Sequence, residues 1–359
     1  MSDQLPSMIS TRRSFLATTT ATASAAILAP TRWIGSAAAA PLLTVASRTI
    51  EVNGKAAKVF QVKGTGVGHG IVAEEGTRFS GALLNATDIP LQLHWHGQIK
   101  APYDQDRARP NGGALAPGQT DSHDFALTPG THWMHAHTLE EQQLLAAPMV
   151  ALEKNRGDVQ DVVVMLHDFA FRSPKEILAE LGGVDAHAGH GSNGAGGSVA
   201  TGQQPARGSG SGSGSGHMMG AAHANDVRYD AYLANDRTLD DPEVVKVDKG
   251  TRVRLRIING STATAYFVST PGLRSQCVAV DGSSCQPVQS ESYPLAQGQR
   301  IDLLVTIPPA GGAFPVLAQV EAERFLTGIV LATPGAEIAK QGKSELRRSK
   351  PAGEFQTHG

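Results

Sequence analysis

The chain has 359 residues, of which 18% are charged and 5% are aromatic, and its formal net charge is −2. That length allows two domains that each bury a core, and the scattered Lys and Arg residues give no sign of a nucleic-acid partner. The 40 glycines and 20 prolines favour many short strands joined by turns over long helices. We therefore expect an all-β protein.

Residues 1–40 have the composition of an export signal. The pair Arg12-Arg13 precedes a weakly apolar Ala/Thr run, and small residues fill positions 36–40. A basic start, an apolar middle and a small-residue end are the parts of a signal peptide, and the paired arginines resemble a twin-arginine signal. The alternative is a disordered, Ala-rich N-terminus that carries no targeting signal. We expect export to the periplasm or the medium, and no membrane span, because the apolar run is short and weak.

Residues 41–181 are expected to form a first domain made of strands broken by turns. The segment 49–52 is followed by Asn53-Gly54, which is the strand-then-turn pattern of a hairpin. Pairs such as Pro117-Gly118 punctuate the later strands, and this spacing is typical of a β-sandwich. Further strands are expected at residues 79–84, 91–96, 123–127, 132–137 and 162–166, with one or two helical turns at 174–181.

The composition changes sharply in residues 182–225, which contain an unbroken Gly/Ser repeat at 208–216. Such a segment buries too little apolar surface to order itself, so we expect a flexible linker. Alternating polar and apolar residues return at 251–258, and they predict a second sandwich domain over residues 226–334. Residues 335–359 are polar and unpatterned, and we expect a tail that is the start of a truncated linker.

Two histidine pairs carry the chemistry. His94 and His96 share one predicted strand, and His135 and His137 share another. Because successive side chains of a strand point to opposite faces, each pair presents two imidazoles on one face. If the strands are neighbours, four neutral imidazoles make a site for copper or zinc. Either pair alone is more often packed than metal-bound, but together they favour a metal site.

These motifs resemble a known family. The sequence His94-Trp95-His96-Gly97, followed downstream by residues 130–137 with the pattern GTxWxHxH, is similar to the first domain of the multicopper oxidases of the laccase and copper-resistance type. Residues 253–259, 280–282 and 300–305 are similar to the copper-free middle domain of that family. The resemblance implies two cupredoxin-like Greek-key β-sandwich domains, joined by the Gly/Ser/His-rich flexible segment.

The resemblance also implies a role for each of the four histidines. It assigns His94 to a type 2 copper and His96 to one copper of a type 3 pair. His135 would share that copper with His96, and His137 would bind the other copper of the pair. The expected cofactor is therefore copper, in type 2 and type 3 sites for which this chain holds half of the ligands.

In that family a last domain supplies four more histidines and a type 1 copper bound through a His-Cys-His motif. Neither Cys277 nor Cys285 lies beside a histidine, so the resemblance implies an N-terminal part that is inactive alone, and whether the chain is an enzyme stays open. A third domain would make it an oxidase of phenols or metal ions, with dioxygen and a reductant as partners besides copper ions. The alternatives are a non-enzymatic periplasmic copper-binding or copper-resistance protein, and a copper-free scaffold for protein interactions.

Other residues leave alternatives open. Cys277 and Cys285 flank the turn Asp281-Gly282, and both a disulfide and two buried thiols fit them. The His and Met residues of the linker either bind copper or are incidental in a solvated segment, and they are His187, His190, His217, Met218, Met219 and His223. Four histidines outside the pairs are expected to be structural or exposed: His69, His123, His132 and His167.

Overall fold

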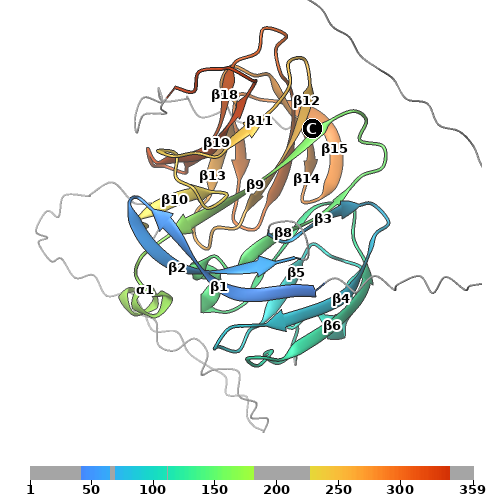
Figure 1. The fold of residues 1–359 in the computed structure, drawn as a ribbon, viewed down its shortest axis with the longest axis vertical. Helices are drawn as coiled ribbons and strands as arrows, with labels where there is room; N and C mark the ends of the chain where they lie inside the picture. Colours follow the sequence, from blue (N-terminus) through green and yellow to red (C-terminus); the bar gives the residue numbers. More distant parts are fainter. Residues whose placement is uncertain (1–41, 65–68, 111, 182–226, 340–359) are drawn as a thin grey trace, which may run out of the picture. The chain divides into compact units, whose positions relative to one another are not determined.

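The computed structural model describes residues 42–64, 69–110, 112–181 and 227–339 (Figure 1). Nineteen strands, one short α-helix and two 3-10 turns make up the regular structure of these residues, so the expectation of a mostly β protein is confirmed for them. The expected signal peptide, the linker and the tail beyond residue 339 lie outside the described residues. No helix within the described ranges is long and apolar enough to cross a lipid bilayer.

Residues 42–152 form a first sandwich of two sheets. Its elements are β1 (Leu42–Val52), β2 (Lys55–Lys63), β3 (Ile71–Glu74), β4 (Arg78–Asn85), β5 (Leu93–His96), η1 (Tyr103–Gln105), β6 (Thr120–Ala126), β7 (Gly130–Ala136), η2 (Leu139–Gln143) and β8 (Ala146–Leu152). The sheets have the strand orders β2-β1-β4-β6 and β3-β8-β7-β5. Apolar side chains from both sheets, such as Phe79 and Met134, form the core between them.

Local sequence accounts for several of these elements. In the β1–β2 hairpin Val52 pairs with Lys55, and the two turn residues Asn53 and Gly54 have φ values of 52° and 78°. Positive φ at both central positions is the type I′ geometry that an Asn-Gly pair favours, so the predicted hairpin is confirmed. Burial in β5 alternates strictly, with the two histidines on the more open face.

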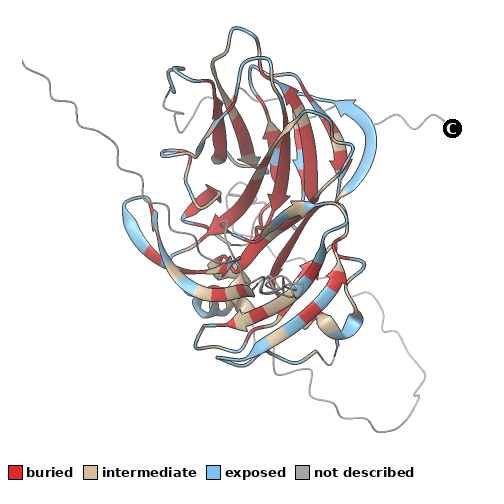
Figure 2. Cartoon of the chain, turned by 45° about the vertical axis from the view of Figure 1, so that its right-hand side comes forward, coloured by how far each residue is buried: buried red, intermediate tan, exposed pale blue. Residues whose placement is uncertain are grey.

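The second sandwich comprises residues 160–332. Its strands are β9 (Gln160–Phe169), β10 (Ala231–Ala234), β11 (Val244–Lys246), β12 (Arg252–Asn259), β13 (Tyr266–Ser269), β14 (Ser275–Val280), β15 (Ser283–Gln289), β16 (Tyr293–Leu295), β17 (Arg300–Thr306), β18 (Ala313–Val320) and β19 (Leu326–Ala332). The sheet orders are β10-β9-β12-β17-β14-β15 and β11-β19-β18-β13-β16. Buried residues fill its inner strands, whereas the edge strand β15 is exposed along its whole length (Figure 2).

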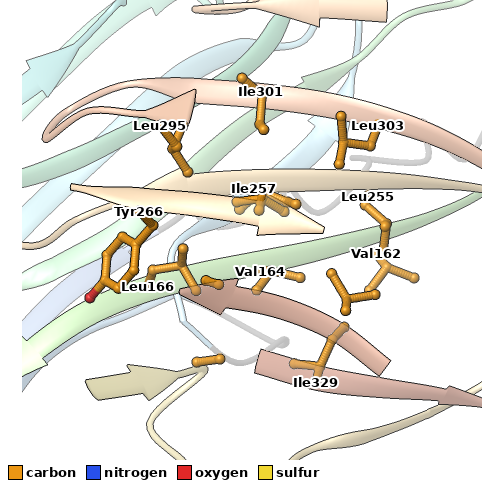
Figure 3. Packing of buried hydrophobic residues seen from close by; sticks show 14 of the residues in the cluster. Val162, Val164, Leu166, Leu255, Ile257, Tyr266, Leu295, Ile301, Leu303 and Ile329 are labelled. Carbon is orange, nitrogen blue, oxygen red and sulfur yellow. The ribbon is translucent and has the colours of Figure 1, made fainter. Parts of the chain in front are cut away.

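The strand β9 belongs to the sheet of the second sandwich. Sequence analysis placed residues 162–166 in the first domain, but β9 pairs in parallel with β12 and antiparallel with β10. In Figure 1 the green β9 lies among the yellow-to-red strands. Val162 and Val164 of β9 pack beside Leu255 and Ile257 of β12 in one core (Figure 3). A strand with this buried face can join either sandwich, and its local sequence pattern does not predict which strands it pairs with.

The predicted helical turns after β9 form the helix α1 (Pro174–Glu180). Ser173 caps it: its hydroxyl accepts a hydrogen bond from the Glu176 amide, while the Glu176 carboxylate accepts one from the Ser173 amide. Together with a proline in the first turn, this capping box satisfies amide groups that the helix leaves free at its start.

A buried ionic network joins the two sandwiches. Arg256 of β12 is fully buried and donates hydrogen bonds to Glu153, just after β8 (2.6 Å), and to Asp302 of β17 (3.2 Å). Arg254 donates to the same two carboxylates at 2.9 Å each. Thr131 of β7 adds a hydroxyl that donates to Asp302 at 2.6 Å. Because buried charges need partners, this network ties the strand that bears His135 to the second sandwich.

Candidate metal site

The two histidine pairs lie on neighbouring strands. β5 and β7 are antiparallel, and in their register His94 lies directly opposite His135. His137 follows β7, where its backbone amide donates to the Gln92 carbonyl at 2.8 Å and continues the strand contact. The condition set by the sequence, that the two strands be neighbours, is therefore met.

The structure brings all four imidazoles together. The ring centre of His94 lies 5.4 Å from that of His96, 5.5 Å from that of His135 and 5.0 Å from that of His137. Nδ1 of His96 lies 3.2 Å from Nε2 of His135. One nitrogen from each of His94, His135 and His137 falls within 4.8 Å of the other two. Four convergent nitrogen donors are a ligand set that copper and zinc accept.

Two carboxylates orient these imidazoles. Nδ1 of His94 lies 2.8 Å from Oδ2 of Asp106, and Nδ1 of His135 lies 2.7 Å from Oε1 of Glu141. Because an ionised carboxylate only accepts hydrogen bonds, Nδ1 of each ring is the donor, which leaves Nε2 as the nitrogen available to a metal. Burial alone raises the pKa of Asp106, but the hydrogen bond from His94 and the nearby positive charges outweigh it and lower that pKa.

Sequence reasoning missed both carboxylates. Asp106 follows the 3-10 turn η1, twelve positions after His94, and Glu141 lies in η2, six positions after His135. The only available signal was an acidic residue in the loop after each pair, which is too common to single out. The Trp95 indole N–H donates to the Gln105 carbonyl at 2.6 Å, so the core side of β5 anchors the turn that carries Asp106.

Burial and neighbouring charges lower the pKa of His96 and of His137. Burial, then the positive charge of Arg300, then the other imidazoles lower the pKa of His96 to about 3. Burial followed by the nearby His135 also lowers the pKa of His137. A neutral imidazole is the form that binds a metal, so both side chains are ready to act as ligands at neutral pH.

Trp133 forms one wall of the site. Its side chain is 1% exposed, and its ring stacks on His135 at 4.1 Å and on His96 at 5.1 Å between ring centres. The same indole packs with Met165 and Ile258 of the second sandwich. The wall behind the two histidines is therefore continuous with the contact between the sandwiches.

Four other histidines and both cysteines lie in the part of the chain that the structure describes. Both cysteines are free thiols, Cys277 buried and Cys285 exposed, and burial followed by the neighbouring Cys285 raises the pKa of Cys277 to about 11. A protonated thiol is a poor metal ligand. Among the described histidines outside the two pairs, three are buried and one is exposed, as expected: His123, His132, His167 and the exposed His69. The histidines and methionines of the linker lie outside the described residues.

Comparison with known families gives two matches that cover most of the chain. Models described as multicopper oxidase match residues 44–155 and residues 162–334. Multicopper oxidase MmcO of Mycobacterium tuberculosis is 26% identical over 81% of this chain and 56% of its own length. The copper resistance protein A homolog of Pseudomonas syringae pv. tomato is 25% identical over 82% of this chain and 52% of its own length. The chain thus spans about half the length of these curated relatives.

Solved structures show the same fold. The multicopper oxidase Fet3p, described as functioning in iron import, superposes with a TM-score of 0.63 at 14% identity, over 86% of this chain and 55% of its own. A multi-copper oxidase from Pseudomonas thermotolerans gives a TM-score of 0.58 at 21% identity, over 84% of this chain and 64% of its own. At these identities the likeness concerns the fold alone.

Proposed function

Because the chain belongs to the multicopper oxidase family, we propose that His94, His96, His135 and His137 bind copper. The observation that carries the proposal is the meeting of four imidazoles on two paired strands, within the first region that matches the family. The donor set fits the ion, since neutral imidazole nitrogens suit copper. Asp106 and Glu141 accept hydrogen bonds from Nδ1 of His94 and of His135. A hydrogen bond from the ring nitrogen that does not bind the metal is usual for metal-bound histidines.

The distances also fit the division of ligands that the family resemblance implies. Two nitrogens bound to one tetrahedral ion at about 2.0–2.1 Å lie about 3.3 Å apart, and the facing nitrogens of His96 and His135 are 3.2 Å apart. These two side chains therefore suit a shared type 3 copper. His94 and His137 complete the group as ligands of a type 2 copper and of the second type 3 copper.

For the whole protein we infer an oxidase of phenols or metal ions. In such an oxidase, bound copper would pass electrons from the reductant to dioxygen and yield water. The support is family membership together with half of the expected ligand set on this chain. The twin-arginine-type sequence of residues 1–40 and the copper-resistance relatives support an exported, periplasmic or secreted protein. A non-enzymatic copper-binding or copper-resistance role is the alternative, and the name of that relative favours it.

Copper titration of the purified chain tests the ligand assignment. The background is a variant in which the four linker histidines, His187, His190, His217 and His223, are alanine, so that they cannot compete. We expect His94→Ala combined with His135→Ala to abolish tight copper binding, measured against a chromophoric chelator. His69→Ala, at an exposed histidine outside the site, serves as the matched control. Unchanged copper stoichiometry in the double variant would refute the assignment.

Dioxygen uptake separates the two roles. The copper-loaded chain is mixed with a phenol or with Cu(I), and oxygen consumption is followed with an electrode. Catalytic uptake by the chain extended to the full length of its relatives supports an oxidase, whereas tight copper binding without uptake by that extended chain supports the non-enzymatic role.

A further inference from the structure

The described residues of the second sandwich contribute no histidine to the site, yet one of its turns lies against His96. Gly298 lies in the turn between β16 and β17, with a φ of +74°. A Cβ atom at this glycine would lie 3.3 Å from Cε1 and 3.9 Å from Nε2 of His96, and 4.0 Å from the Trp133 ring. The His96 ring is therefore enclosed between the Trp133 indole and the backbone of this turn.

The turn is rigid because its polar groups are bonded. The Gly298 amide donates to the Asn259 carbonyl at 2.9 Å, and the Gln299 carbonyl accepts from the Asn259 amide at 3.0 Å. The Gln299 side chain also accepts from the Ala296 amide at 2.9 Å. A turn held on both sides in this way cannot move aside without losing several hydrogen bonds.

Arg300 fastens the turn to the first sandwich. The residue is 4% exposed, and its guanidinium donates to the Gly298 carbonyl at 2.9 Å and to the Thr131 carbonyl of β7 at 3.2 Å. It also forms an ion pair with Asp281 at 3.1 Å. One side chain thus links the turn to the strand that bears Trp133 and His135.

Gly97, the residue after His96, lies close to Arg300 as well. Gly97 has a φ of +83°, and a Cβ atom there would lie 2.8 Å from Nη2 of Arg300 and 2.2 Å from Nδ1 of the buried His132. A side chain at this position cannot fit beside those two groups. Both the ring of His96 and the residue that follows it are therefore held by contacts that include the second sandwich.

From these contacts we infer that the turn around Gly298, fastened by Arg300, is a positioning element that fixes the His96 ring for copper. This inference rests on the proposed function of His96 as a ligand. Ligand rings must be held to within about 0.5 Å for tight binding, and a glycine with its φ in the left-handed region lets the backbone approach the ring closely. The copper-free sandwich thereby supplies one wall of a copper site.

Gly298→Ala tests the inference, with Gly250→Ala as its matched control. Gly250 lies in the same sandwich with a φ of +75°, but a Cβ atom there meets nothing within 4 Å. Both substitutions strain the backbone alike, so the urea midpoint of the apo protein should fall by a similar amount in each. Only Gly298→Ala pushes on His96, and we expect it to weaken copper binding about tenfold.

A double-mutant cycle separates positioning from a general structural effect. In a His96→Ala background the alanine at 298 has no ring to displace, so it should cause no further loss of copper affinity. Arg300→Lys, which keeps the charge but cannot reproduce the fork of hydrogen bonds, should weaken binding in the same His96-dependent way. The nitrogen hyperfine pattern of bound Cu(II) should change in Gly298→Ala and not in Gly250→Ala.

The outcomes distinguish this inference from the function on which it rests. If the parent chain binds no copper through the four histidines, the proposed function fails. If the parent binds copper and Gly298→Ala binds it equally well, or loses as much affinity without His96 as with it, the positioning role is overturned.

Discussion

Replacing Asp106 with alanine is expected to weaken copper binding about 10- to 100-fold, the usual cost of losing a partner that orients a ligand. Asp106 holds Nδ1 of His94 at 2.8 Å, and its side chain is only 3% exposed, so water screens this contact very little. At about 1.4 kcal/mol for each factor of ten, the loss corresponds to about 1.4–2.8 kcal/mol. Without the carboxylate, His94 is free to turn and to place its proton on the metal-facing nitrogen.

Two further variants are expected to lose less copper affinity than Asp106→Ala. Asp106→Asn keeps a neutral acceptor, and because charge-assisted hydrogen bonds are about twice as strong as neutral ones, it should lose about half as much binding free energy as alanine. Glu141→Ala removes the equivalent partner of His135, but the Glu141 side chain is 25% exposed. Water can replace part of that contact, so its loss should be smaller than that of Asp106→Ala.

The assay is competition for Cu(II) with a chelator of known affinity at pH 7, combined with urea unfolding of the apo protein. Asp104→Ala is the matched control, since Asp104 is an exposed residue of the same turn. Equal copper affinity in Asp106→Ala and Asp104→Ala would show that the carboxylate does not support the ligand. A parallel fall in affinity and in stability for both variants would show that only the turn was damaged.

Three other predictions concern stability and access. Arg256→Met should lower the free energy of unfolding by about 3–5 kcal/mol, because it leaves Asp302 buried without one of its partners; urea denaturation measures this, and a loss below about 1 kcal/mol contradicts it. Burial lowers the pKa of both His132 and His167 below the unfolded value of about 6.5. As the pH drops from 7 to 5 the unfolded state therefore binds protons before the folded state does, and the urea midpoint of the apo protein should fall. A urea midpoint that does not change with pH would contradict the buried neutral state. The exposed His137 should be replaceable by alanine with a change in unfolding free energy of less than about 0.5 kcal/mol, while copper affinity drops; calorimetry and chelator competition check the two halves.

Features with a local cause could be predicted from the sequence. Asn53-Gly54 specifies its turn through backbone preference alone, and the alternation around His94 specifies which side chains share a face. The neighbouring placement of β5 and β7 needed more than local pattern. That placement could be predicted only by assuming that the two histidine pairs share one metal site. The assumption rests on the chemistry of side chains such as His135 and not on the strand pattern.

Features that depend on distant partners could not be predicted. Alternation in residues 251–258 indicates a strand, but it does not show that the face carrying Arg254 and Arg256 is covered by the first sandwich rather than by water. The partner of β9 was equally hidden, because its buried side chains fit either core. Asp106 and Gly298 matter only through contacts with His94 and His96 that the folded chain creates, so neither carries a local signal of its role.

The burial of β7 explains how the two sandwiches and the site depend on one another. All seven residues of this strand are buried, so both of its faces are covered, unlike those of β5. On the face that bears His135, Thr131 donates a hydrogen bond to the ionic network, and Trp133 packs against apolar residues of the second sandwich. His137, beyond the end of the strand, is exposed. This face therefore runs from the contact between sandwiches to solvent, so the imidazoles are held firmly at one end and are open to an arriving ion at the other.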